Sequence, residues 1–144
     1  MYDHILLPTD GSSNTTEALE HACAIAGAHD ATVHGLYVVD RRHLMAASDD
    51  TTDEIRGSLD EESERALDDA RVRLEEEDID VETVREEGIP HKTITTDADE
   101  ADVDVVVMGT HGKTGRERVA TLGSTTERVV KNADQPVLVV EIGD

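Results

Sequence analysis

Two glycine-rich stretches in the C-terminal third of the chain have the residue types of an anion-binding site. The first, Gly109 to Gly115, follows an apolar run that ends in Met108 and is typical of a strand buried on both faces of a parallel sheet. The second, Gly123-Ser124-Thr125-Thr126, is typical of a helix start. Glycine lets the backbone approach a ligand closely, and a helix start presents unpaired N–H donors and the positive end of a dipole. The pattern predicts a cradle for an anion such as phosphate.

The first stretch superficially resembles the phosphate-binding loop of many ATPases. That loop needs four residues between its first glycine and its Gly-Lys pair. Here only Thr110 and His111 separate Gly109 from Gly112-Lys113. The stretch is therefore not a loop of that kind.

Strand patterns alternate with helical periodicity along the whole chain. We expect strands over 2–8, 31–39, 79–84, 103–108 and 136–142, and helices over 14–29, 90–101 and 123–132, with a polar stretch over 40–58 that runs from a loop into a charged helix ending near 77. This alternation predicts one α/β domain over 1–144, with a five-stranded parallel sheet covered by helices on both faces. In such sheets the ligand lies beyond the carboxyl ends of the strands, where the strand order reverses. With the order 3-2-1-4-5, the turn containing Thr9 and Asp10 and the turn at Gly109 meet at that point.

The charge of the chain restricts its partners. The formal net charge is −21, from 34 acidic and 13 basic residues. We therefore expect neither nucleic acid nor an anionic membrane as a partner, because both require a positive field. An acidic surface of this kind keeps a protein soluble in concentrated salt, where charges are screened within about 3 Å at 1 M. This composition indicates a halophilic origin, and it means that an anionic ligand must be held by local donors.

Other sequence features indicate a cytoplasmic protein. Cys23 is the single cysteine, which excludes a disulfide framework. No secretory signal precedes the first apolar run, and the apolar runs are too short to span a membrane. The seven histidines are dispersed without the spacing of a zinc site.

The motifs, taken together and in order, resemble those of the universal stress protein (UspA) family over essentially the whole chain. They are Ile-Leu-Leu-Pro-Thr-Asp-Gly-Ser at 5–12, Tyr-Val-Val-Asp at 37–40, Gly-Ile-Pro-His at 88–91, Val-Val-Met-Gly-Thr-His-Gly at 106–112, Gly-Ser-Thr-Thr-Glu-Arg-Val at 123–129 and Pro-Val-Leu-Val-Val at 136–140. The resemblance implies a Rossmann-like or flavodoxin-like domain that forms a homodimer through its last strand, Pro136 to Ile142.

One branch of this family binds ATP through Gly-x2-Gly-x9-Gly-(Ser/Thr), and the resemblance implies an ATP site here, with Mg²⁺ or Mn²⁺ as a possible companion. The resemblance implies that the phosphates and ribose are held by Gly109, Gly112, Gly123 and Ser124, with the backbone N–H of Thr125 beside them. It also implies that Asp10 lies near the ribose or a phosphate-bound cation and that Val38 offers its backbone to the adenine edge. Pro8 lines the site, and Thr9 and Met108 complete the set. This chain has ten residues between Gly112 and Gly123, where the family pattern has nine. A surface loop absorbs one extra residue at small cost.

Several alternatives stay open at this level. Asp10 is equally suited to cap the first helix and to contact a ligand. Lys113 and His111 lie in the glycine loop, although exposed loop residues of these types are commonplace. No arrangement of residues identifies a catalytic centre, so the main hypothesis is a stress-response module that binds an adenine nucleotide. A slow nucleotide hydrolase and a ligand-free dimeric scaffold are the alternatives.

Overall fold

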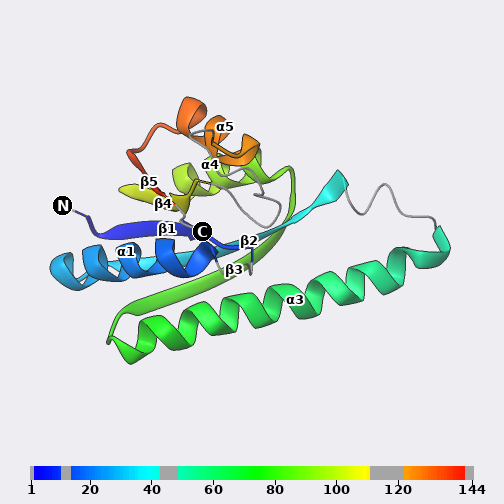
Figure 1. The fold of residues 1–144 in the computed structure, drawn as a ribbon, viewed down its shortest axis with the longest axis horizontal. Helices are drawn as coiled ribbons and strands as arrows, with labels where there is room; N and C mark the ends of the chain where they lie inside the picture. Colours follow the sequence, from blue (N-terminus) through cyan, green and yellow to red (C-terminus); the bar gives the residue numbers. More distant parts are fainter. Residues whose placement is uncertain (1, 11–13, 43–48, 111–121, 142–144) are drawn as a thin grey trace.

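The computed structural model describes residues 2–10, 14–42, 49–110 and 122–141, which form a five-stranded sheet in the order β3-β2-β1-β4-β5 (Figure 1). Every neighbouring pair of strands is parallel. The strand order and the parallel pairing confirm the sequence prediction. The elements are β1 (His4–Pro8), α1 (Asn14–His29), β2 (Thr32–Asp40), α3 (Asp49–Glu76), β3 (Asp80–Gly88), α4 (Pro90–Glu100), β4 (Val105–Gly109), α5 (Ser124–Asn132) and β5 (Val137–Val140).

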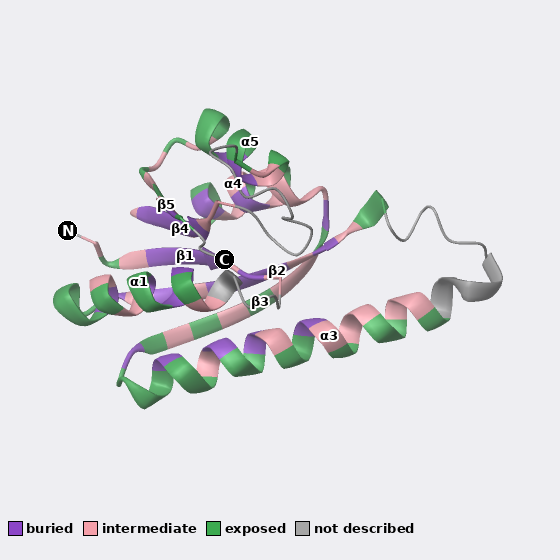
Figure 2. Cartoon of the chain, viewed as in Figure 1, coloured by how far each residue is buried: buried purple, intermediate pink, exposed green. Residues whose placement is uncertain are grey.

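Helices cover both faces of the sheet, because side chains of each strand alternate between the faces. Leu7 of β1 belongs to a buried cluster with Ala22 of α1 and Leu74 of α3. The neighbouring Leu6 belongs to a second cluster with Val129 of α5. Figure 2 shows the buried residues concentrated along the central strands and on the inner sides of the helices. The result is the three-layer arrangement that the alternating pattern predicts.

The strand order reverses at β1. This strand pairs with β2, where Pro8 is opposite Leu36, and with β4, where Ile5 is opposite Val105. The chain leaves β1 towards α1 on one face and leaves β4 towards α5 on the other (Figure 1). The carboxyl ends of β1 and β4 therefore lie side by side, and the helices that follow them cover opposite faces of the sheet.

Helix α3 begins earlier than the sequence pattern indicates. It already includes Asp49, well inside the stretch predicted to begin as a loop. Ile55 and Leu59 pack against the buried cluster of Tyr37 and Val39, and this tertiary contact stabilises a segment of weak helical pattern. None of the helices in the described part of the chain, α3 included, is long and apolar enough to cross a membrane.

The boundaries of all five strands differ from the prediction by one or more residues, most of all at the end of β3. Strand β3 continues to Gly88 rather than ending near Val84, because β2 pairs with it as far as Asp40 opposite Gly88. Charged residues in that extension are accommodated because β3 is an edge strand. Strand β5 covers Val137–Val140, within the predicted 136–142, and Ile142 lies outside the described residues.

Candidate functional site

The candidate site begins where β1 and β4 end. Beyond Pro8, the backbone N–H of Thr9 donates to the carbonyl of Leu36 in β2 at 2.8 Å. Beyond Gly109, the N–H of Thr110 donates to the carbonyl of Val140 in β5 at 3.0 Å. Each turn is thus tied to the outer neighbour of its strand. The two turns are held apart from each other at the point where the strand order reverses.

Hydrogen bonds attach the first turn of α5 to the end of β4. The N–H of Gly123 donates to the carbonyl of Thr110 at 2.7 Å. The hydroxyl of Thr126, which is buried, donates to the carbonyl of Gly109 at 2.9 Å. A direct hydrogen bond therefore joins Thr110 to Gly123, the two residues that flank the intervening segment. The start of α5 is held beside the first glycine of the motif, although the chain has ten residues rather than nine between Gly112 and Gly123.

Among the described residues, no side chain caps the start of α5. Gly123 occupies the N-cap position in an extended conformation, with φ −63° and ψ 158°, and makes no side-chain cap hydrogen bond. Ser124 is exposed and Thr125 is half-buried, so the first turn borders solvent. Backbone N–H groups of an uncapped helix start, together with the helix dipole, attract an anion. This arrangement suits a phosphate.

Strand β2 extends beyond the end of β1 and offers backbone groups on that side. Pro8 is opposite Leu36, whereas β2 continues to Asp40. The carbonyl of Leu36 points towards β1, where it accepts from Thr9. Because successive residues of a strand point their backbone groups to alternate sides, the backbone groups of Val38 also point to the β1 side. No strand of the described chain pairs with Val38 there, so this edge suits the hydrogen-bonding rim of a base.

Eight of the nine described residues of the predicted site fall into two groups, and Met108 lies apart from both. Gly109, Gly123, Ser124 and Thr125 come together at the start of α5. Pro8, Thr9, Asp10 and Val38 lie around the ends of β1 and β2, where Asp10 is half-buried, and the side chain of Met108 is buried between the sheet and the α4/α5 layer. Gly112 lies outside the described residues, as do His111 and Lys113.

Several participants were not predicted from the sequence. Thr126 is visible in the Gly-Ser-Thr-Thr motif, but its bond to Gly109 depends on tertiary structure. His91 lies in the first turn of α4, and burial, followed by the positive charges of Arg128, Lys92 and Arg42, lowers its pKa. No sequence signal joins these basic residues, because they come from three separate elements.

A pair of carboxyl groups lies on the same face of the sheet. Asp97 of α4 meets Glu86, which is opposite Val38 in the β2–β3 ladder. Burial, then the hydrogen bond and negative charge of Glu86 and the charge of Glu100, raise the pKa of Asp97 to about 7. The described residues contain no group of three or more histidine, cysteine or carboxylate side chains arranged to hold a metal ion.

The opposite end of the sheet has a different surface. A cleft of about 510 Å³ lies there, lined by Thr32, Glu75, Asp78, Ile79, Asp80, Val81 and Glu82. The four acidic residues of this wall repel an anion. The cleft is therefore unsuited to phosphate, in spite of its volume.

The sheet is Rossmann-like, and α5 starts without a cap from Gly123 near the point where the strand order reverses. α/β domains with these two features form a class suited to phosphate-bearing ligands. Within this class the family is established by comparison: the profile described as "Universal stress protein family" matches residues 1–141. The chain belongs to this family.

Two archaeal relatives from Methanocaldococcus jannaschii match nearly the whole chain. Universal stress protein MJ0531 is 42% identical over 142 residues, covering 98% of this chain and 83% of the relative. Universal stress protein MJ0577 is 33% identical over 156 residues, covering 98% and 96%. The solved structure of MJ0577 superimposes with a TM-score of 0.89 at 35% identity, covering 100% of this chain and 99% of that one.

Two more distant structures share the fold and were determined with nucleotides. A universal stress protein in complex with cAMP has a TM-score of 0.70 at 23% identity, covering 97% of each chain. The universal stress protein from Archaeoglobus fulgidus in complex with dAMP has a TM-score of 0.72 at 20% identity, covering 96% of this chain and 97% of that one. These likenesses establish the common fold.

Proposed function

We propose that this protein binds an adenine nucleotide, in the first instance ATP, and acts as a regulatory binding module of a stress response in a cytoplasm of high salt concentration. The observation that carries the proposal is the uncapped start of α5, held against the end of β4 by the Gly123–Thr110 and Thr126–Gly109 hydrogen bonds. The cAMP and dAMP complexes support it, since they show that this fold can accommodate adenine nucleotides.

Each group of site residues has a distinct task in this proposal. The N–H groups of Ser124 and Thr125 hold phosphate oxygens, and Gly109 allows the backbone to approach them closely. The backbone of Val38 meets the edge of adenine beyond the end of β1. The half-buried carboxylate of Asp10 is placed to accept from ribose hydroxyls or to share a phosphate-bound Mg²⁺, which prefers oxygen ligands.

Such a module controls a partner by changing shape or surface charge when the nucleotide is bound. A nucleotide hydrolase is the second candidate, and turnover that disappears in Asp10→Ala while binding persists would identify it. A ligand-free scaffold is the third, and it predicts that no nucleotide binds.

A nucleotide titration decides between the module and the scaffold. We expect the purified protein to release ATP on denaturation, or to bind added ATP with Mg²⁺ in potassium buffer. Gly123→Val leaves the backbone in an allowed conformation but places a branched side chain at the helix start, so affinity falls at least about tenfold, or about 1.4 kcal/mol. Gly57→Val is the matched control, because a side chain at Gly57 in α3 meets open space. Absence of nucleotide in the extract and in the titration would refute the proposal.

We further propose that the protein is a homodimer through β5. This edge strand carries Leu138, which is 36% exposed, beside half-buried Val137 and Val139. The other edge strand, β3, carries five charged residues, Asp80, Glu82, Arg85, Glu86 and Glu87. An exposed apolar edge favours pairing with another strand, whereas charges protect an edge from it. We expect Leu138→Asp to convert a dimer into a monomer in sedimentation equilibrium, whereas Val84→Asp on β3 does not; a monomeric parent protein would exclude the dimer.

A further inference from the structure

Basic side chains from separate elements gather at the carboxyl end of the sheet. Asp40 at the end of β2 is opposite Gly88 at the end of β3, so the chain leaves these strands side by side. Arg42 follows the first strand by two residues, and Lys92 follows the second by four. Strand register alone therefore brings these two cations to one edge.

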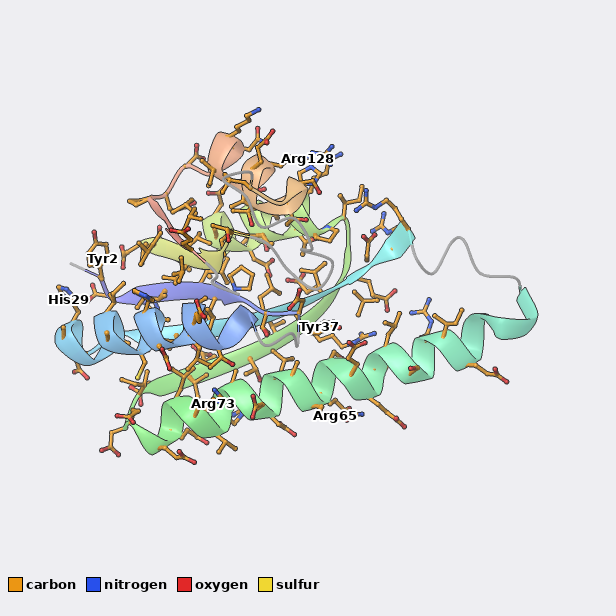
Figure 3. All side chains as sticks on the ribbon, viewed as in Figure 1. Tyr2, His29, Tyr37, Arg65, Arg73 and Arg128 are labelled. Atoms are coloured by element: carbon orange, nitrogen blue, oxygen red, sulfur yellow. The ribbon has the colours of Figure 1, made fainter. Side chains whose placement is uncertain are left out.

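Helix α5 adds a third cation at this edge. Arg128 is four residues after Ser124, so both lie on one face of the helix, and helical side chains lean towards the N-terminus. Arg128 thus leans towards the uncapped helix start. Figure 3 shows Arg128 projecting from α5 on the side of the molecule where β2 ends.

The environment of His91 supports the same grouping. Its pKa is lowered by burial and then by the positive charges of Arg128, Lys92 and Arg42. One imidazole in the first turn of α4 is therefore within electrostatic reach of all three cations.

The cations differ in how far they are neutralised. Arg42 donates from Nε and Nη2 to the carboxylate of Asp40 at 3.0 and 2.8 Å. Lys131, at the far end of α5, pairs with Glu127 at 3.1 Å. In contrast, Lys92 and Arg128 are exposed and make no ion pair with any described residue. In a chain with a net charge of −21, these two cations are available to a ligand.

We propose that Lys92 and Arg128, assisted by His91, bind the terminal phosphates of a nucleotide whose first phosphate lies at the start of α5. The site then selects nucleoside triphosphates over monophosphates. The inference rests on the proposed nucleotide site, and it adds residues that lie outside the glycine motif. It also accounts for how a strongly acidic protein attracts an anion, since a local positive field opposes the repulsion of the remaining surface.

Removal of the two charges tests the inference. The double variant Lys92→Gln/Arg128→Gln is compared with the parent by calorimetric titration with ATP, AMP and inorganic tripolyphosphate at two potassium chloride concentrations. We expect ATP affinity to fall about tenfold at the lower salt concentration and less at the higher, while AMP affinity changes less than about twofold. Lys131→Gln is the matched control, because it removes one positive charge from the same helix away from its start.

The outcomes separate this inference from the proposed function. Equal losses for ATP and AMP, or an ATP loss no larger than that of Lys131→Gln, overturn the inference and leave nucleotide binding intact. If no nucleotide binds to the parent protein, the proposed function fails. In that case, tripolyphosphate that binds the parent but not the double variant still supports a polyphosphate site, and tripolyphosphate that does not bind overturns it. A thermal melt of each variant confirms that the fold is retained.

Discussion

The two ends of the β-sheet present opposite surfaces to a ligand. At the carboxyl end, α5 begins without a side-chain cap, and Lys92 and Arg128 make no ion pair with described residues. At the amino end, acidic residues that include Glu75 and Glu82 line a cleft of about 510 Å³. The acidic cleft at the amino end therefore has the wrong charge for a phosphate, whereas the carboxyl end offers backbone donors and two cations.

This contrast shows why overall charge is a poor guide to ligand charge. The chain carries −21, yet charge acts over about 8–10 Å at ordinary ionic strength. Several basic side chains elsewhere are paired, for example Arg73 with Asp69 at 3.5 Å within α3. Lys92 and Arg128 at the carboxyl end are different because they make no ion pair with any described residue. A local positive field can thus exist within an acidic protein.

The carboxyl end depends most on Thr126, and its loss is expected to have the largest effect. Thr126→Val keeps the volume but removes the buried hydroxyl that donates to the carbonyl of Gly109. Because that carbonyl loses a partner, we expect the free energy of unfolding to fall by about 1–3 kcal/mol. We also expect weaker ATP binding, since α5 is no longer held against β4. Urea denaturation and a nucleotide titration measure both effects.

Thr95→Val is the control for that experiment. The hydroxyl of Thr95 donates only within its own helix, to the carbonyls of His91 and Lys92, both at 3.1 Å. A loss of stability in Thr126→Val no greater than in Thr95→Val would show that the bond does not join the two elements. The carboxyl end would then differ from the amino end in charge alone.

Much of this arrangement is predictable from local patterns, and the remainder is not. The strand order and the position of the Asp10 and Gly109 turns at the ends of neighbouring strands follow from alternating strands and helices and from two glycine turns. The start of α3 was not predicted, because its first turns depend on contacts of Ile55 with β2 residues. The grouping of Lys92 with Arg128 joins positions far apart in the chain. The packing of α4 on α5 brings these two residues together, and the register of β2 with β3 adds Arg42.

The amino end of the sheet should respond to pH through His34, with a smaller effect. His34 and His4 share a hydrogen bond, with His34 Nε2 and His4 Nδ1 3.1 Å apart. The Nδ1 of His34 lies 3.9 Å from a carboxylate oxygen of Glu82. Burial lowers the pKa of His34, and the charge of His4 lowers it further, while Glu82 opposes both. The folded state therefore binds a proton at His34 less readily than the unfolded state. This contribution to stability is fully present above the unfolded pKa of 6.5 and is lost as the pH falls from 6.5 through the lower pKa of the folded state.

His34→Gln removes this titration and so tests whether the amino end is sensitive to protons. Between pH 7.5 and pH 5.5 we expect the parent protein to lose stability, with less than about 1 kcal/mol of the loss assigned to His34, because the side chain retains contact with solvent. Denaturation curves at the two pH values should show a smaller loss in His34→Gln than in the parent. His21→Gln, an exposed change on α1, should behave like the parent. An identical pH dependence in all three proteins would mean that Glu82 offsets burial completely, and the contrast between the ends would then be one of ligand charge only.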